Sequence, residues 1–240
     1  MGFPLTQTPI STRPPLAQAL VTLAETPDDM PEIGDRLQVV ARLAAHRIGI
    51  VTYAAITPRP DDGSSTVATS PDLVEAIDDA TPDLPGEPAP HVEPGPAADG
   101  LAATIEWPGF RDTAAGMGMG VVSVPLFTGS GTTVATLDLY GPDPATMAPI
   151  AAGIRAAYDP DLPWPDGSED GSTSDPGVDE LVEGVAEALS TRSTIQLALD
   201  MIRIGTAPGA TDAYLTLRLL AADDSVSLLD AATTLIAGRP

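Results

Sequence analysis

The 240-residue sequence contains no cysteine and no lysine, and only 4% of its residues are aromatic. The absence of cysteine excludes disulfide bonds, thiolate metal ligands and cysteine nucleophiles. No apolar run approaches the roughly 20 residues that a membrane-spanning helix needs, and no signal-peptide pattern of basic and then apolar residues is found near the start. We therefore expect a cytoplasmic protein.

Positive charge is also scarce, because eleven arginines are the only basic residues and they face 34 acidic ones. The net charge of −23 repels polyanions such as nucleic acid and anionic membranes. Hydrophobic residues make up 43% of the chain, which is enough for a packed core. The length allows one large domain or two modest ones.

The clearest boundary is the segment 159–177, which is rich in proline, glycine and serine and carries six acidic residues but no basic one. Such a composition cannot sustain an apolar period, so we interpret it as an acidic, flexible linker. The block before it, residues 1–158, has 19 acidic residues and seven arginines. The block after it, residues 178–240, has nine acidic residues and four arginines.

The first block mixes helical and strand patterns. Strands with turns between them, flanked by helices, indicate an α+β fold with an antiparallel sheet. An acidic, proline-rich loop is expected at 81–100. The expected helices cover 16–23, 35–46, a stretch from Ser70 or Asp72 to Asp79, a short stretch after Trp107, and 143–158; the expected strands cover 49–57, 66–70, 121–128 and 132–141.

The second block has only helical patterns. Apolar residues recur in steps of three and four from Leu181 to Ile202, which is a heptad stripe that Arg192 interrupts. Pro208 and Gly209 should end this helix. A second helix is predicted from Thr211 or Asp212 to Ala222, and a third with Ser225 as its N-cap, which gives a small three-helix bundle. The stripe is longer than one such bundle needs to bury, so we expect a homodimer.

Residues 107–144, WPGFRDTAAGMGMGVVSVPLFTGSGTTVATLDLYGPDP, resemble GAF domains of actinobacterial regulators. The shared features are a WP-x-F helix, a Ser-Val-Pro-Leu strand, a glycine turn and a Leu-x-Leu-Tyr strand. The resemblance extends over roughly 15–158. It implies an antiparallel sheet with helices on both sides, and a domain that senses a small ligand, here unknown, or dimerises.

Residues 178–240 are similar to the ANTAR domain, a three-helix RNA-binding antiterminator module. The residues that carry the resemblance are Ala188, Leu189, Arg192, Ile195, Ala198, Ile202, Ala213, Tyr214, Leu217, Arg218, Leu228, Asp230, Ala232, Leu235 and Ile236. The chain departs from the family at Leu199 and Asp200, where a lysine–glycine pair is usual, and at Ser227, where a basic residue is common. These departures remove positive charge from the surface expected to meet RNA.

The resemblance predicts a signal-responsive transcription antitermination regulator whose dimeric helical domain binds structured leader RNA. Arg192 and Arg218 are then the candidate RNA contacts, since phosphate neutralisation needs arginine or lysine. The alternative is a ligand-sensing or protein-interaction module that does not bind RNA. We expect no enzymatic activity, because no nucleophile motif such as G-x-S-x-G is present.

Several candidate residues also have a purely structural interpretation. Arg192 could form an ion pair with Glu187, Asp200 or a partner subunit, and Arg218 could pair with Asp223 or Asp230. Asp138, in the middle of a strand, is expected on a solvated face instead of in a sensor pocket.

The sequence offers little support for a cofactor or a phosphate site. His46 is expected at a helix end, where the helix dipole favours a cation, and His91 lies in the acidic loop. No metal site is expected at either histidine. The GMGMG run at 116–120 is interpreted as a turn, because a phosphate loop must follow a strand and open a helix.

Overall fold

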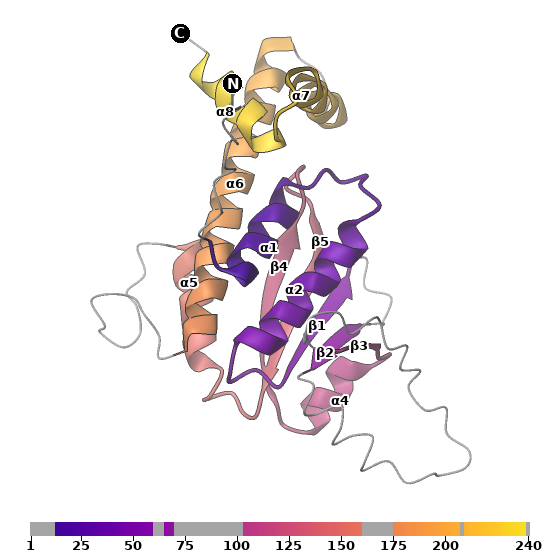
Figure 1. The fold of residues 1–240 in the computed structure, drawn as a ribbon, viewed down its shortest axis with the longest axis vertical. Helices are drawn as coiled ribbons and strands as arrows, with labels where there is room; N and C mark the ends of the chain where they lie inside the picture. The colour runs from indigo at the N-terminus through magenta and orange to yellow at the C-terminus, as the bar shows by residue number, and fades with distance from the viewer. Residues whose placement is uncertain (1–12, 60–64, 70–102, 160–174, 207–208, 239–240) are drawn as a thin grey trace, which may run out of the picture.

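The computed structural model describes residues 13–59, 65–69, 103–159, 175–206 and 209–238. These residues form a five-stranded antiparallel sheet with helices on both faces, and a long helix that extends beyond the sheet and carries two short helices at its far end (Figure 1). The elements, in chain order, are α1 (Pro15–Glu25), α2 (Ile33–Arg47), β1 (Tyr53–Pro58), β2 (Thr66–Thr69), β3 (Ala103–Glu106), α4 (Phe110–Gly116), β4 (Gly120–Phe127), β5 (Thr133–Gly141), α5 (Ala148–Tyr158), α6 (Pro176–Thr206), α7 (Ala210–Asp224) and α8 (Leu228–Ala237).

The sheet has the strand order β3-β2-β1-β5-β4, and every neighbouring pair is antiparallel. This arrangement confirms the predicted mixed fold with an antiparallel sheet, as well as the hairpins β1–β2 and β4–β5. Strand β3 was not predicted. It is only four residues long and pairs with β2 at the edge of the sheet, so it carries little periodicity that a sequence pattern could reveal.

The main hydrophobic core lies on one face of the sheet, under α1, α2, α5 and the first half of α6. Every second residue of the two central strands faces this core, including Ile56 on β1 and Leu137 and Leu139 on β5. Helix α1 begins with Pro15 in its first turn, where the missing N–H costs nothing, and ends shortly before Pro27. Its buried face is continuous with that of α2.

Helices α1 and α6 pack closely because small residues meet between them. A Cβ atom on Gly184 would lie 2.6 Å from the Cα atom of Ala17, so no larger residue fits at position 184 without moving the helices apart. Several apolar side chains next to this contact belong to the main core: Leu16, Leu20, Leu181, Val182 and Val185.

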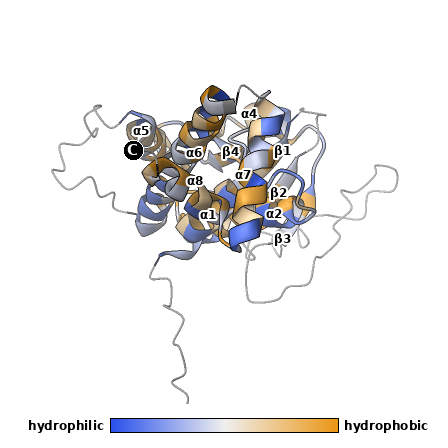
Figure 2. Ribbon diagram, turned by 90° about the horizontal axis from the view of Figure 1, so that it is seen from above, coloured by the Kyte–Doolittle hydropathy of each residue, from blue (hydrophilic) through white to orange (hydrophobic). Residues whose placement is uncertain are grey.

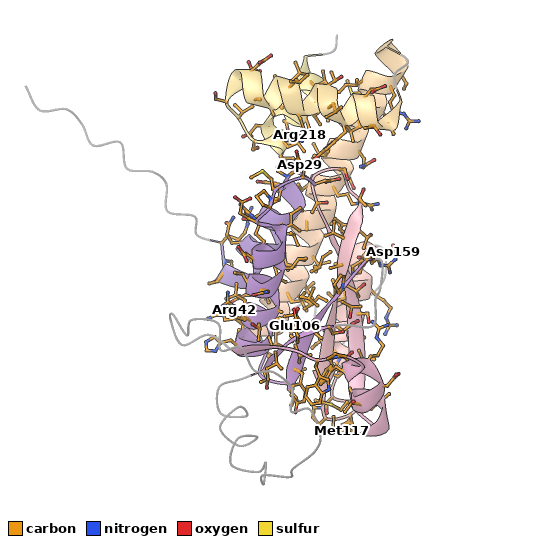
Figure 3. All side chains as sticks on the ribbon, turned by 90° about the vertical axis from the view of Figure 1, so that its right-hand side faces the viewer. Asp29, Arg42, Glu106, Met117, Asp159 and Arg218 are labelled. Atoms are coloured by element: carbon orange, nitrogen blue, oxygen red, sulfur yellow. The ribbon has the colours of Figure 1, made fainter. Side chains whose placement is uncertain are left out.

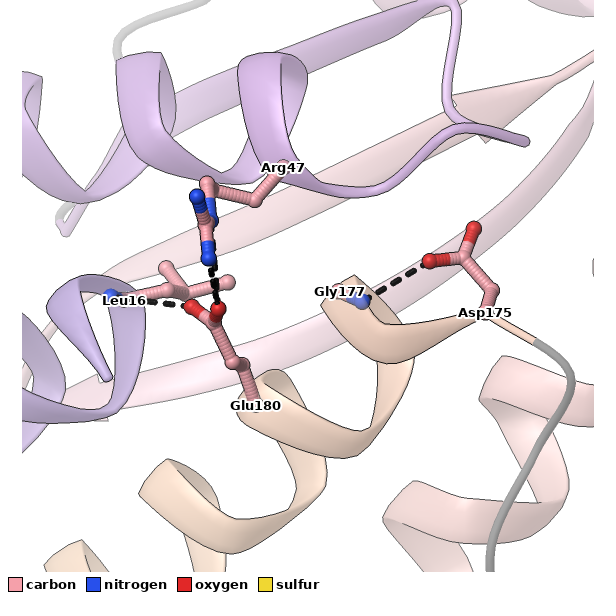
Figure 4. Close-up of polar contacts among 5 residues, drawn as sticks. All are labelled: Leu16, Arg47, Asp175, Gly177 and Glu180. Carbon is pink, nitrogen blue, oxygen red and sulfur yellow. Dashed lines mark hydrogen bonds and ion pairs between the residues drawn. The ribbon is translucent and has the colours of Figure 1, made fainter. Parts of the chain in front are cut away.

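The start of α6 is fixed to α1 and α2 by the carboxylate of Glu180 (Figure 4). This side chain is only 8% exposed and accepts hydrogen bonds from the Arg47 guanidinium, one of them 3.1 Å from Nε to Oε1. The backbone N–H of Leu16 donates to its other oxygen at 3.4 Å. The Gly177 N–H donates to the Asp175 carboxylate at 2.8 Å, which satisfies one amide in the first turn of the helix.

A second, smaller core is formed by the second half of α6 with α7 and α8. Its buried residues include Ile195, Leu199 and Ile202 of α6 and Leu217 of α7. One continuous helix of 31 residues therefore contributes to two cores, and the division between them lies within α6, between Val185 and Ile195. We call the sheet with its packed helices the sheet unit, and the second half of α6 with α7 and α8 the helical unit.

The heptad stripe from Leu181 to Ile202 is covered by the chain itself. Leu181 and Val185 are buried in the sheet unit, and Ile195, Leu199 and Ile202 are buried in the helical unit. The exposed apolar surface that motivated the expectation of a homodimer is therefore absent from these positions. The sequence pattern is the same whether the covering helices belong to one chain or to two.

The N-cap of the third bundle helix differs from the prediction. Ser225 has the left-handed backbone conformation, with φ 54°, and ends α7 as its C-cap. Ser227 is the N-cap of α8, where its hydroxyl accepts a hydrogen bond from the Asp230 N–H at 3.0 Å and donates to the Asp230 carboxylate at 2.9 Å. These two bonds between Ser227 and Asp230 satisfy an amide in the first turn of α8, which is the role of a serine N-cap.

Several predictions concern residues outside the described part of the chain. These are the turn at 60–64, the helix from Ser70 or Asp72 to Asp79, the acidic loop at 81–100 with His91, and residues 160–174 of the acidic linker. Among the described residues, no helix is long and apolar enough to cross a membrane.

Candidate functional site

The two units meet at a junction built from the α1–α2 loop, the β4–β5 turn and the faces of α6, α7 and α8 directed toward them. The turn is bonded to the loop by two backbone amides: Gly129 N–H donates to the Thr26 carbonyl at 2.7 Å, and Ser130 N–H donates to the Asp28 carboxylate at 3.0 Å. The loop and the turn thus form one polar surface, on which the helical unit docks (Figures 1 and 3).

Arg192, predicted to contact RNA, lies at this junction. Its Nε donates to the Gly131 carbonyl at 3.0 Å, and its guanidinium lies 4.5 Å from the centre of the Phe127 ring. The ion-pair partners expected from the sequence are engaged elsewhere, because Glu187 pairs with Arg13 and Asp200 pairs with Arg203. Arg192 thus holds α6 to the β4–β5 turn.

Arg218, the second predicted RNA contact, joins α7 to the α1–α2 loop. Its guanidinium lies 2.8 Å from the Asp29 carboxylate and not beside Asp223 or Asp230 (Figure 3). The hydrogen bond from Arg218 lowers the pKa of Asp29, and the same bond raises the pKa of Arg218. One turn earlier on α7, the Tyr214 hydroxyl accepts a hydrogen bond from the Asp28 N–H at 3.1 Å, and burial raises the pKa of Tyr214.

Two glycines make the β4–β5 turn narrow enough to enter the junction. A Cβ atom on Gly129 would lie 2.8 Å from Cδ2 of Leu228, so α8 packs directly on its backbone. Gly131 has φ +76°, and a Cβ atom there would lie 2.4 Å from Nε2 of Gln196. That Gln196 amide donates to the Ser130 carbonyl. The predicted hairpin turn is therefore also a contact surface for α6 and α8.

A second polar site lies on the sheet face opposite the main core. Asp138 is fully buried there, contrary to the expectation of a solvated position. Its carboxylate accepts hydrogen bonds from Thr57 Oγ1 at 3.0 Å, from the Arg111 guanidinium at 2.7 Å and from the Ser123 hydroxyl. Thr57 also contacts the buried hydroxyl of Ser65 at 3.2 Å. The carboxylate is thus desolvated and compensated by one cation and two hydroxyls.

Aromatic rings pack beside this carboxylate on the same sheet face. Phe110 of α4 is buried, with ring centres 5.3 Å from Tyr53, 5.1 Å from Trp107 and 5.0 Å from Tyr140. Burial raises the pKa of Tyr140, and the Asp138 charge adds to this rise. The WP-x-F segment therefore provides the ring that covers this face, and the arginine after it, Arg111, reaches Asp138.

Sequence reasoning missed most of the residues at both sites. Thr57, Ser123 and Asp138 lie side by side on one face of three neighbouring strands, and this alignment of polar residues across strands is a signal that was available. No comparable signal pointed to Asp28 and Asp29, which lie in a loop and contact α7, 186 and 189 residues away.

The surface of the helical unit combines acidic and apolar residues. Its described residues from Arg192 to Gly238 include five acidic residues, Asp200, Asp212, Asp223, Asp224 and Asp230, and three arginines, Arg192, Arg203 and Arg218. Leu197 and Ile204 of α6 and Leu215 and Leu219 of α7 are exposed, Ile204 at 77% and Leu219 at 65%. Figure 2 shows α7 carrying both hydrophilic and hydrophobic residues along its length.

The remaining candidate motifs have structural roles. The GMGMG run follows α4 and opens β4, as expected for a turn, and Gly118 within it has φ +73°. His46 is exposed in the last turn of α2. In the part of the chain that the structure describes, no group of three or more histidine or acidic side chains is placed to hold a metal ion. No family model, curated protein or solved structure matches the chain.

Proposed function

We propose that this protein is a signal-responsive transcription antitermination regulator, in which the sheet unit receives a signal and the helical unit binds structured RNA. The observation that carries this proposal is the position of Arg192 and Arg218. Both lie at the junction, bonded to the sheet unit, so their availability to a ligand depends on how the helical unit is docked. A change in docking is therefore a direct way for the sheet unit to control the helical unit.

Charge explains why such control would be effective. RNA binding needs arginine or lysine to neutralise phosphates, and the described helical unit has more acidic residues than arginines. With Arg218 paired to Asp29 and Arg203 paired to Asp200, the docked form presents RNA with a mostly negative surface. Release of Arg192 and Arg218 would add two cations to that surface.

The proposed signal input is the sheet face with Asp138 and the aromatic rings. A buried carboxylate held by a guanidinium and two hydroxyls can exchange these partners for groups of a small molecule. Because β5 carries Asp138 and is joined to β4 by the Gly129–Gly131 turn, the input face and the junction belong to one hairpin.

A second candidate function, a protein-interaction output without RNA binding, is favoured by the exposed apolar residues. Leu197 and Ile204 lie two turns apart on one side of α6, and Leu215 and Leu219 lie one turn apart on α7. Such residues are typical of a surface that meets a protein partner. If the protein is a homodimer, this surface is the place for its interface, since the Leu181–Ile202 stripe is covered.

The experiment that separates these functions is a pull-down of cellular RNA with the full chain, followed by filter binding of the recovered structured RNA at low and high salt. We expect Arg192→Gln and Arg218→Gln each to weaken retention and to reduce the salt slope by about one unit per lost phosphate contact. Asp29→Asn, which releases Arg218, should strengthen retention. Arg59→Gln, at an exposed position on the sheet unit, is the matched control.

The outcomes are distinct for the two candidates. No retention of any structured RNA at low salt, by either the original protein or Asp29→Asn, contradicts the RNA proposal and leaves the protein-interaction function. Retention that is unchanged by Arg192→Gln and Arg218→Gln contradicts the assignment of these two residues.

A further inference from the structure

A cleft of about 490 Å³ opens at the junction, between the α1–α2 region and the α7–α8 turn. It is separate from the sheet face with Asp138, and it lies within the range of roughly 300–1,000 Å³ that is usual for small-molecule sites. Its walls come from both units, with Glu25, Met30 and Arg36 on one side and Val226 and Leu228 on the other. A molecule bound here would touch the sheet unit and the helical unit at the same time.

Two charged side chains in the cleft form neither a hydrogen bond nor an ion pair within the described part of the chain. Neither Glu25 nor Arg36 has a side chain that forms a hydrogen bond or an ion pair with another residue of the described chain, and each is partly buried. Burial raises the pKa of the Glu25 carboxyl, Arg13 opposes the rise, and the negative charge of Asp230 adds to it. A partly buried carboxylate without a donor is costly, so a bound cation would stabilise it.

Between these charges the lining is largely apolar. Met30 on the α1–α2 loop and Val226 and Leu228 after α7 contribute aliphatic or thioether surface, and Val226 is 42% exposed. The cleft thus combines the unpaired anion of Glu25, the unpaired cation of Arg36 and an apolar wall, while its second cation, Arg218, is already paired with Asp29. Its chemistry is complementary to a molecule that carries an ammonium group, a carboxylate group and an aliphatic body.

We propose that this cleft is a binding site for a small apolar zwitterion of the amino-acid or short-peptide class. The ammonium group pairs with Glu25, the carboxylate pairs with Arg36, and the aliphatic side chains pack on Val226 and Leu228. Because the ligand bridges the two units, its binding stabilises the docked arrangement, and this stabilisation grows with the logarithm of the ligand concentration above the dissociation constant. This site goes beyond the proposed regulator function, since the binding itself requires no RNA.

The test is calorimetric titration of the full chain with L-leucine and the dipeptide Leu-Leu. Two analogues of the dipeptide each lack one charge: N-acetyl-Leu-Leu has no ammonium, and Leu-Leu-amide has no carboxylate. We expect saturable binding of leucine or Leu-Leu, and at least about tenfold weaker binding of the corresponding single-charge analogue, as for the loss of one charge-assisted hydrogen bond.

Variants assign each charge to its partner. Glu25→Gln should weaken the binding of Leu-Leu about as much as N-acetylation of the dipeptide does, and it should not weaken the binding of N-acetyl-Leu-Leu further. Arg36→Gln should likewise weaken the binding of Leu-Leu about as much as amidation does, without weakening the binding of Leu-Leu-amide further. Glu106→Gln and Arg59→Gln, exposed on the sheet unit and outside the cleft, are the controls and should bind Leu-Leu like the original protein. Figure 3 shows Glu106 far from the junction that Arg218 and Asp29 mark.

A second measurement, hydrogen exchange of α7 and α8 amides, tests the bridging geometry. We expect the ligand to slow exchange in both helices. The proposal is overturned if neither leucine nor Leu-Leu gives saturable binding at millimolar concentration, or if binding is unaffected by Glu25→Gln and Arg36→Gln. Failure of RNA binding would leave these results unchanged, so the two proposals are tested independently.

Discussion

The two halves of α6 show how one helix can serve two different kinds of packing. The first half is enclosed by α1, α2 and α5 above the sheet and is fixed by the buried carboxylate of Glu180. The second half buries its apolar residues against α7 and α8, and the unit that it forms docks on the sheet unit through Arg192, Gln196 and Arg218. The first attachment is mainly apolar and the second is mainly polar.

This difference has a consequence for stability and for regulation. Apolar burial contributes about 25 cal/mol per Å² to the free energy of folding, whatever the orientation of the groups. Each exposed ion pair or single hydrogen bond contributes on the order of 1 kcal/mol or less. We therefore expect that undocking of the helical unit requires less free energy than unfolding of the sheet unit.

The largest effect is expected from the same substitution made in each half. Leu181→Ala removes a fully buried side chain from the main core and should lower the free energy of unfolding by about 2–5 kcal/mol. Leu199→Ala, at 8% exposure in the small core, should instead open the helical unit selectively. Chemical denaturation combined with hydrogen exchange measures both. If Leu199→Ala raises exchange equally in the sheet strands, the two halves form one cooperative unit and the comparison fails.

The next effect is expected at the turn between the units. Gly131→Ala places a side chain at φ +76°, which costs about 1–2 kcal/mol, and pushes against Gln196, whose bond to Ser130 contributes about 1 kcal/mol. Gly118→Ala is the matched control, because φ is +73° there but nothing lies within 4 Å of the added carbon. Thermal unfolding should show a larger loss of stability for Gly131→Ala than for Gly118→Ala. Equal losses would mean that the turn does not support the docked helix.

A smaller effect is expected from the ion pair between buried Glu180 and partly exposed Arg47 at the start of α6. Glu180→Gln keeps an acceptor for the Leu16 N–H but removes the charge that faces Arg47. Since the Arg47 side chain is 41% exposed, water compensates part of the loss, and we expect about 1–2 kcal/mol. Urea unfolding measures the change. A variant as stable as the original protein would show that apolar packing alone fixes the first half.

Sequence periodicity predicted most elements of this fold and the pairing of its two hairpins, but it missed β3 and did not show which helices pack together. The spacing from Leu181 to Ile202 correctly indicated a helix, yet the same spacing is compatible with cover from any neighbouring helix, and here the chain itself supplies it. Ser225 and Ser227 are both plausible caps by residue type, and only the backbone conformation distinguishes them. Local patterns specify local structure, and the pairing of distant elements adds information that they do not contain.

The candidate sites follow the same rule. Arg192 and Arg218 were singled out because the family resemblance includes both and because RNA phosphates need basic partners. The structure places both at the junction between the two units. Their partners, Gly131 and Asp29, are distant in sequence and of types that are common on surfaces. Asp138 was misplaced because a charged residue in a strand usually faces water, and its burial depends on Arg111, which reaches it from a separate helix.

The smallest effect is expected from the exposed ion pair that joins α7 to the loop. The Arg218 hydrogen bond lowers the pKa of Asp29, so the ionised carboxylate favours the docked form. This contribution should be fully present above the ordinary carboxyl pKa of 3.8 and should be lost as the pH falls through the lowered value. Asp29→Asn should remove this part of the pH dependence and slightly reduce the protection of α7 amides relative to α1 amides, as measured by hydrogen exchange. Because the carboxylate is exposed, 1 M salt should largely abolish the difference between the two proteins. An equal difference at high salt would show that Asp29 supports docking through the shape of its loop and not through its charge.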